Sequence, residues 1–473
     1  MKKYGIIAIV VVAIAAIGIA GWKLIYGRDD SMASSLPADV TMIGRMDLKT
    51  MLVDYGLDLA DLKELLASEG AEETGIKYQT AAYFFASQGH FGAIVALSDD
   101  DDFEAFLTKQ GCTVEEQRGL KWSVIDGNAL LAFNGDRAML MGPAVGAEQD
   151  ALRNTIAACM KQKASVSGKQ SRLYKLLDKR DEPLALATNL QTVADAAPLK
   201  VQTPQGVSPE DVNLMAGFTA HKDRLTLSFA LDTDNKDVEK QVKKMSDGAK
   251  PIKGALVQTT PPNPLFHMEM GIDGEDLIEM MRENNQLRTA LLGINMVFDL
   301  DMILKAIDGD VALTCLDYAD GTPSVLLQAQ VENDKFMKKV TDWNDAATRA
   351  MGLSFYSQDE QNGVCLFHGM PVYFGTQKKR LSISNTESLV KADGYADVKT
   401  KLESEVKGNL LYVTVSVDKA RQLVDEMYPV DVDFLRIFDR LTLTVRDVGQ
   451  MRIDLVAHEG VDILKELKQA SGK

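Results

Sequence analysis

Short runs in which apolar and polar residues alternate recur along the chain and predict β-strands. Residues 225–231 (Leu-Thr-Leu-Ser-Phe-Ala-Leu) and 441–445 (Leu-Thr-Leu-Thr-Val) show the pattern most clearly. Such alternation is typical of a strand with one apolar and one polar face. Between groups of strands, apolar residues recur at a spacing of three or four and predict helices, as after the acidic run 99–102. Strands that arrive in hairpins, with helices between the groups, predict an α+β fold with mostly antiparallel sheets.

One strand-to-helix phrase occurs twice in the chain. Residues 36–52 predict a short strand, an aspartate and an amphipathic helix, and residues 263–278 repeat that order. Asp47 and Asp273 hold the same place in the two phrases. We expect each to cap its helix, because a carboxylate accepts the free amide hydrogens of a first helical turn. The order of elements then repeats at an offset of about 225–245 residues, which predicts an internal duplication.

The domain boundaries follow from this repeat. We expect a first α+β repeat at residues 36–250, a linker at 251–264 and a second α+β repeat at 265–473. A chain of 473 residues is too long for one ordinary core. Proline suppresses both helices and central strands, and the linker contains four prolines: Pro251, Pro261, Pro262 and Pro264.

An apolar segment lies near the N-terminus. Residues 5–22 carry no charge, and the segment from Gly5 to Tyr26 reaches the roughly 20 residues that a membrane helix needs. Lys2 and Lys3 precede it, which favours a cytoplasmic N-terminus and a periplasmic C-terminal region.

The segment predicts a single-pass protein of the inner membrane. In this interpretation residues 1–28 form the anchor and residues 29–35 a short polar tether. The alternative is a signal peptide cleaved after Ala20, which would release the rest of the chain into the periplasm.

The formal net charge of −16 limits the classes of partner. A surface this acidic repels nucleic acid and anionic lipid headgroups, so no nucleic-acid partner is expected. It suits solubility or a basic partner. Besides the inner membrane, we expect a protein partner in the cell envelope.

The residue types that build most metal and catalytic sites are dispersed. The cysteines contain no C-x-x-C pair, and four cysteines leave three disulfide pairings open; they are Cys112, Cys159, Cys315 and Cys365. The histidines contain no helical metal-binding pair; they are His90, His221, His267, His368 and His458. We therefore expect no metal, no cofactor and no catalytic residue, although a carboxylate pair assembled by the fold stays open.

The start of the first repeat resembles a known family. The phrase Leu36-Pro-Ala-Asp, the strand after it and Asp47-Leu-Lys-Thr-Met-Leu are similar to a Bacteroidota family of exported envelope proteins known as domain of unknown function 4836. The resemblance covers most of the chain after Ser35. It implies a fold and an envelope location, but no catalytic residues. Members of the family are often lipoproteins, and this chain lacks the lipobox cysteine.

These observations together predict a membrane-anchored envelope protein. Its expected role is non-enzymatic binding, scaffolding or assembly in the periplasm. Two alternatives remain. One is a carrier that holds an apolar ligand between sheet and helices, and the other is an enzyme whose site comes from distant carboxylates. The ligand and the oligomeric state are not defined by the sequence.

Overall fold

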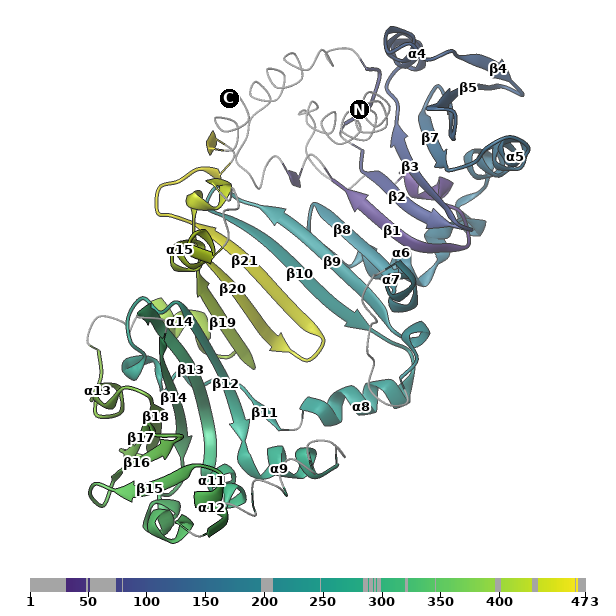
Figure 1. The fold of residues 1–473 in the computed structure, drawn as a ribbon. Coiled ribbons are helices and arrows are strands. Elements are labelled where there is room, and N and C mark those ends of the chain that lie inside the picture. Colours follow the sequence, from purple (N-terminus) through teal and green to yellow (C-terminus); the bar gives the residue numbers. More distant parts are fainter. Residues whose placement is uncertain are drawn as a thin grey trace. The chain divides into compact units, whose positions relative to one another are not determined.

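The computed structural model divides into two compact units, Met1–Val238 and Glu239–Lys473 (Figure 1). The border lies inside helix α8 (Lys236–Ser246), ahead of the linker expected at 251–264. The structure describes residues 31–47, 50–51, 74–78, 80–196, 207–246, 248–283, 299–319, 322–344, 346–395, 401–427 and 433–463, with the single positions 288, 292, 295, 465 and 466.

The described strands of unit 1 pair antiparallel, in the order β4–β5–β6–β7–β3–β2–β1–β8–β9–β10. Asp126 and Gly127, both at positive φ, form the tight turn between β5 and β6, as the Asp-Gly pair predicts. The strands are β1 (Val40–Met46), β2 (Ala82–Ser87), β3 (His90–Ala96), β4 (Glu115–Gln117), β5 (Leu120–Ile125), β6 (Ala129–Asn134), β7 (Arg137–Gly142), β8 (Leu184–Asn189), β9 (Asn213–Ala220) and β10 (Arg224–Asp232).

Two apolar clusters cover the two faces of this sheet. The larger packs η2 (Ser31–Ser35), α5 (Glu148–Lys161) and α6 (Arg172–Asp178) around Ile43 and Phe85. The smaller packs α4 (Asp100–Lys109) on the opposite face, since the two clusters use alternate residues of the same strands. The Asp99 carboxylate accepts hydrogen bonds from the first turn of α4, so the acidic run starts a helix as predicted. Helix α7 (Leu190–Ala196) follows β8.

The described strands of unit 2 also pair antiparallel, in the order β15–β16–β17–β18–β14–β13–β12–β19–β20–β21. A short strand, β11 (Ala249–Lys250), adds to the end of β12. The others are β12 (Phe266–Asp273), β13 (Ile307–Ala319), β14 (Thr322–Val331), β15 (Leu353–Ser357), β16 (Asn362–Phe367), β17 (Met370–Gln377), β18 (Arg380–Ser384), β19 (Leu411–Ser416), β20 (Phe438–Asp447) and β21 (Gln450–Ala457).

The two units share one order of strand pairing. The central strand β1 pairs with β2 and β8, and β12 pairs in the same way with β13 and β19. The registers also correspond. Ile43 on β1 lies between Phe85 and Ala187, and Glu269 on β12 lies between Ala312 and Tyr412. A position in one unit can therefore be compared with the corresponding position in the other.

Helices and 3-10 turns cover both faces of the unit 2 sheet. One cluster joins η6 (Val257–Thr259) and α14 (Lys401–Val406) to Tyr412. The other joins α11 (Leu300–Ala306) and η7 (Lys335–Trp343) to β14–β18. Residues 335–343, which carry the buried Phe336 and Val340, form a 3-10 helix. The remaining helices are α9 (Gly274–Glu283), α12 (Ala346–Ala350), α13 (Glu387–Val390) and α15 (Val417–Met427).

The predicted location in the inner membrane has to be corrected. Within the part of the chain that the structure describes, no helix is both long enough and apolar enough to cross a membrane. The longest helix there is α5, with 14 residues, and a span needs about 20. The segment from Gly5 to Tyr26 and the cleavage site after Ala20, on which that prediction rested, lie outside the described residues.

Candidate functional site

The two aspartates singled out in the sequence both lie at the end of a central strand. Asp47 accepts hydrogen bonds from the Thr50 amide (3.0 Å) and the Thr50 hydroxyl (2.9 Å). Asp273 accepts hydrogen bonds from the amides of Glu275 (3.0 Å) and Asp276 (3.3 Å) in the first turn of α9. These contacts are those of helix starts, and neither aspartate lines a described pocket.

The histidines and cysteines do not gather at one place. Among the described residues no three His, Cys, Asp or Glu side chains converge in a way that could hold a metal ion. All four cysteines are free thiols. Burial raises the pKa of the Cys112, Cys159 and Cys365 thiols, and a protonated thiol is a poor nucleophile.

An open strand position lies beside β5 in unit 1, and it was not visible in the sequence. β5 pairs along its whole length with β6 on one side. On the other side the three-residue strand β4 pairs only with Leu120, Lys121 and Trp122. No described strand pairs with this edge along residues 123–125. Backbone groups at a free edge offer hydrogen bonds to an added strand.

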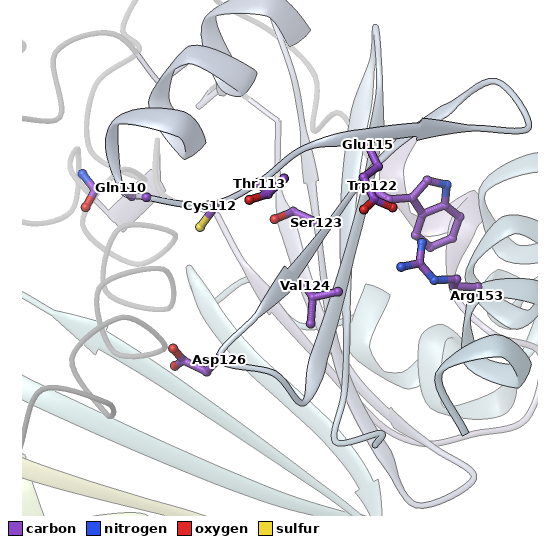
Figure 2. A pocket seen from close by; sticks show the side chains of 10 residues that line it. Gln110, Cys112, Thr113, Glu115, Trp122, Ser123, Val124, Asp126 and Arg153 are labelled. Carbon is purple, nitrogen blue, oxygen red and sulfur yellow. The ribbon is translucent and has the colours of Figure 1, made fainter. Parts of the chain in front are cut away.

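A pocket of about 320 Å³ occupies this open strand position (Figure 2). The chain between α4 and β4 forms one wall through Cys112 and Thr113, and β5 forms the other through Ser123 and Val124. Val124 is 39% exposed, while Ser123 is buried and its hydroxyl faces the Cys112 thiol. The pocket therefore combines an apolar contact with polar side chains.

Two acidic side chains lie at the ends of the pocket. Asp126 follows β5 at the turn, and Glu115 begins β4. The Arg153 guanidinium of α5 lies 5.1 Å from the Trp122 ring centre, a cation–π contact. The indole also donates a hydrogen bond to the Gln117 carbonyl (3.2 Å). Trp122 and Arg153 thus pack together on one side of the pocket.

A buried polar pair is the second unusual feature, and it lies on β12 in unit 2. His267 and Glu269, two residues apart, point to the same face of the sheet, and both are 0% exposed. His267 Nε2 lies 3.4 Å from Glu269 Oε2, too long for a good hydrogen bond, and neither carboxylate oxygen has another partner among the described residues. His267 Nδ1 lies 2.9 Å from the Thr314 hydroxyl.

Sequence reasoning missed this pair because it searched for helical metal spacing. The signal was present: in Phe-His-Met-Glu-Met, residues 266–270, the polar side chains take every second position of an apolar strand. On a strand with alternating residue types, the apolar positions are ordinarily the buried ones. In the structure the polar positions are fully buried, while Phe266, Met268 and Met270 are only partly buried.

The comparisons with curated proteins and with solved structures do not indicate a function. No curated protein matches the chain. Crystal form IV of TP0453 matches at 11% identity and a TM-score of 0.28, over 42% of this chain and 79% of its own. Crystal form III of TP0453 matches at 8% identity and a TM-score of 0.29, over 46% of this chain and 86% of its own. With TM-scores of 0.28 and 0.29, these two matches do not support a conclusion about the fold of this chain.

The comparison with protein-family models gives a match over most of the chain. The family model described as a domain of unknown function, DUF4836, matches residues 36–420. This range includes Asp47, Asp273 and all but the last strands of unit 2. The match confirms the resemblance seen in the sequence, and because it covers well over half of the 473 residues, the chain belongs to the DUF4836 family.

Proposed function

We propose that this protein is a non-enzymatic binding protein that holds an extended peptide at the open strand position of unit 1. The peptide would lie antiparallel or parallel beside residues 123–125 of β5 and donate and accept backbone hydrogen bonds along that edge. This mode of recognition uses the main chain for affinity and pockets for side-chain preference.

The observation that carries the proposal is the difference between the two units. β16 holds the place of β5 in unit 2, and its turn at His368 and Gly369 corresponds to the turn at Asp126 and Gly127. β15 pairs with β16 over residues 363–367, up to the turn. β4 stops three residues short of the turn. The missing part of β4 has the dimensions of a short added strand.

The surroundings of the open position define the chemistry of the peptide. Val124 is exposed at its centre, so an apolar side chain on the added strand would cover it. Asp126 and Glu115 lie at the two ends, and Arg153 is the one cation among the lining residues. The net negative charge of the lining favours basic residues flanking that apolar side chain. The acidic balance of the chain, −16, suits the same partner.

We also propose that the units are copies of one ancestral module. The shared order of nine strand pairings and the corresponding registers of β1 and β12 support a duplication. The open position would then be a loss in unit 1 or a gain in unit 2. Separate experimental structures of the units should superpose strand for strand, and two different strand orders would contradict the duplication.

A set of labelled seven-residue peptides tests the binding proposal. Each peptide alternates Thr with Val, Ile or Leu and carries a lysine at both ends, and fluorescence anisotropy reports binding to the full chain. We expect Val124→Asp to weaken binding at least tenfold, because it removes the apolar contact and adds negative charge inside the pocket. N-methylation of alternate peptide amides should weaken binding as strongly, because it blocks the backbone hydrogen bonds.

Tyr356→Asp is the matched control. Tyr356 is 52% exposed on β15, the edge strand that corresponds to β4, so this variant adds the same charge to the complete edge and should leave binding unchanged. Two outcomes would overturn the proposal. One is that no peptide of the set binds, and the other is that bound peptides ignore both Val124→Asp and N-methylation.

A further inference from the structure

We propose that His267 and Glu269 form a proton-operated latch in unit 2. The latch acts on the cover of the sheet, defined as residues 251–260 and helix α14. While Glu269 keeps its proton, the cover stays closed over the pair. When Glu269 loses the proton, the cover loosens and admits water to the carboxylate.

The closed state is neutral. The proton of a neutral Glu269 can point toward His267 Nε2, which lies 3.4 Å from Oε2, so the contact between them is long and weak. In that tautomer His267 donates from Nδ1 to the Thr314 hydroxyl, 2.9 Å away. Both residues are 0% exposed, so an uncharged pair is the state that burial tolerates best.

The ionised state has no such support. Among the described residues, His267 Nε2 faces the carboxylate at 3.4 Å, and neither oxygen of Glu269 has a hydrogen bond of normal geometry. One long contact compensates a buried negative charge poorly, so the ionised state is unfavourable. Burial accordingly raises the pKa of Glu269, and the neighbouring charge of Asp310 acts in the same direction, while His267 opposes it. Access of water is the direct way to relieve the charge, and it requires the cover to move.

The closed cover is held by contacts that do not involve Glu269. Asp310 accepts hydrogen bonds from the amides of Lys253 (2.8 Å) and Ala255 (2.7 Å). The amide of Ile252 donates to the Asn409 carbonyl (2.8 Å). These contacts fix residues 251–260 on the sheet, so loss of the proton should loosen the cover without unfolding the unit.

The other charged groups around the pair already have partners. On the α14 side, Tyr412 donates a hydrogen bond to Glu405 (2.8 Å), and Glu405 pairs with Arg440 of β20 at 2.8 Å. Burial raises the pKa of Tyr412, so this phenol keeps its proton. On β21, Asp454 pairs with Arg452 at 2.8 Å. Glu269 is therefore the buried carboxyl near the cover whose charge would lack a partner in the part of unit 2 that the structure describes.

The direction of the pH response follows from linkage. In the closed state the pKa of Glu269 is raised above the ordinary carboxyl value of 4.5. In the open state water reaches the carboxyl, and its pKa returns close to that value. Because the closed state then binds more protons, its stability falls as pH rises from about 4.5 through the raised pKa of the closed state, and levels off above it.

Hydrogen exchange of the full chain, read by mass spectrometry at pH 5 and pH 8 and corrected for intrinsic rates, tests the latch. We expect the protection of residues 251–260 and 401–409 to fall at least tenfold between pH 5 and pH 8. Glu269→Gln keeps the shape and the neutral state, so it should remove most of that change. In unit 1 the corresponding place holds Ile43, and the segment over it, η2, should change little.

Two results would overturn the latch. One is an equal loss of protection over η2 and over residues 251–260, and the other is an unchanged pH response in Glu269→Gln. If Glu269→Gln fails to fold, the comparison of the two covers in the unsubstituted chain still decides. An absence of any pH-dependent difference between them rejects the proposal.

Discussion

At the scale of single residues, Asp273 combines two interactions that are usually separate. One carboxylate oxygen accepts the amide hydrogens at the start of α9. The other pairs with Lys250 at 2.6 Å, and Lys250 also pairs with Asp308 at 2.8 Å. The hydrogen bond from Lys250 lowers the pKa of Asp273, with help from the amides of Asp276 and Glu275. Asp273 thus links a helix start to the end of two strands.

Asp273→Ala should therefore destabilise unit 2 by about 0.5–2 kcal/mol at pH 7, the usual cost of a lost helix cap. The depressed pKa means that this contribution is present above the ordinary carboxyl value of 3.8 and disappears as pH falls through the lowered value. Urea unfolding at pH 7 and near pH 2 measures both. Asp276→Ala is the control, because Asp276 lies in the same turn but its side chain does not cap the helix. If Asp273→Ala lowers the free energy of unfolding equally at both pH values, the argument is contradicted.

At the scale of elements, one buried arginine joins a helix end to the sheet of unit 1. Arg45 on β1 is 2% exposed. Its guanidinium donates to the carbonyls of Leu177 (3.2 Å), Arg180 (2.8 Å) and Glu182 (3.1 Å). These carbonyls lie at and just after the end of α6, where a positive charge is favourable. The forked guanidinium group of Arg45 therefore holds the segment that connects α6 to β8 in place.

Arg45→Lys should destabilise unit 1 by about 1–3 kcal/mol, because a single ammonium cannot reproduce the fork and leaves a buried carbonyl unpaired. Arg45→Met removes all three hydrogen bonds and should cost more. Arg118→Lys, at an exposed arginine, should stay within about 0.5 kcal/mol. Chemical denaturation followed by circular dichroism gives the three values. If Arg45→Lys behaves like Arg118→Lys, the three carbonyls do not depend on the fork.

The same scale shows how far the sequence defines the fold. Alternating residues and Asp-Gly turns are local signals, so the strands and the β5–β6 hairpin could be predicted from them. The α+β class followed, and its antiparallel sheets are confirmed. The helical form of residues 335–343 could not be fixed locally, because an amphipathic spacing fits both a 3-10 and an α-helix over so short a stretch.

The candidate sites depend on contacts between distant residues, and for this reason the sequence did not predict them. The path of residues 110–114 decides whether β4 continues to the turn. No repeating pattern of apolar and polar residues indicates that path. The burial of Glu269 depends on residues 251–260 and α14, more than a hundred residues apart. Alternation on β12 shows that the two faces differ, but it does not show which face is covered.

At the scale of the whole molecule, each unit has its own cores. One pair of clusters belongs to unit 1 and another to unit 2. Cores of this kind support independent cooperative unfolding. The latch and the open strand position would then act in separately stable parts of one chain.

Calorimetry of the full chain should accordingly show two transitions. Arg45→Lys should lower the midpoint of one and Asp273→Ala that of the other, because each residue contributes to a single unit. Rising pH above 5 should lower the transition that responds to Asp273→Ala. A single transition that moves with both substitutions would show that the units unfold together.

The free edge beside residues 123–125 would also limit how many peptides the proposed site can hold. The corresponding edge of β16 is already paired with β15, so among the described strands the shared strand order leaves this interrupted edge in unit 1 and a paired edge at the corresponding place of unit 2. A protein with two interrupted edges could cross-link its partners into open-ended arrays. If a peptide binds at this interrupted edge as proposed, one peptide would fill it, and the protein would terminate a strand pairing there instead of propagating it.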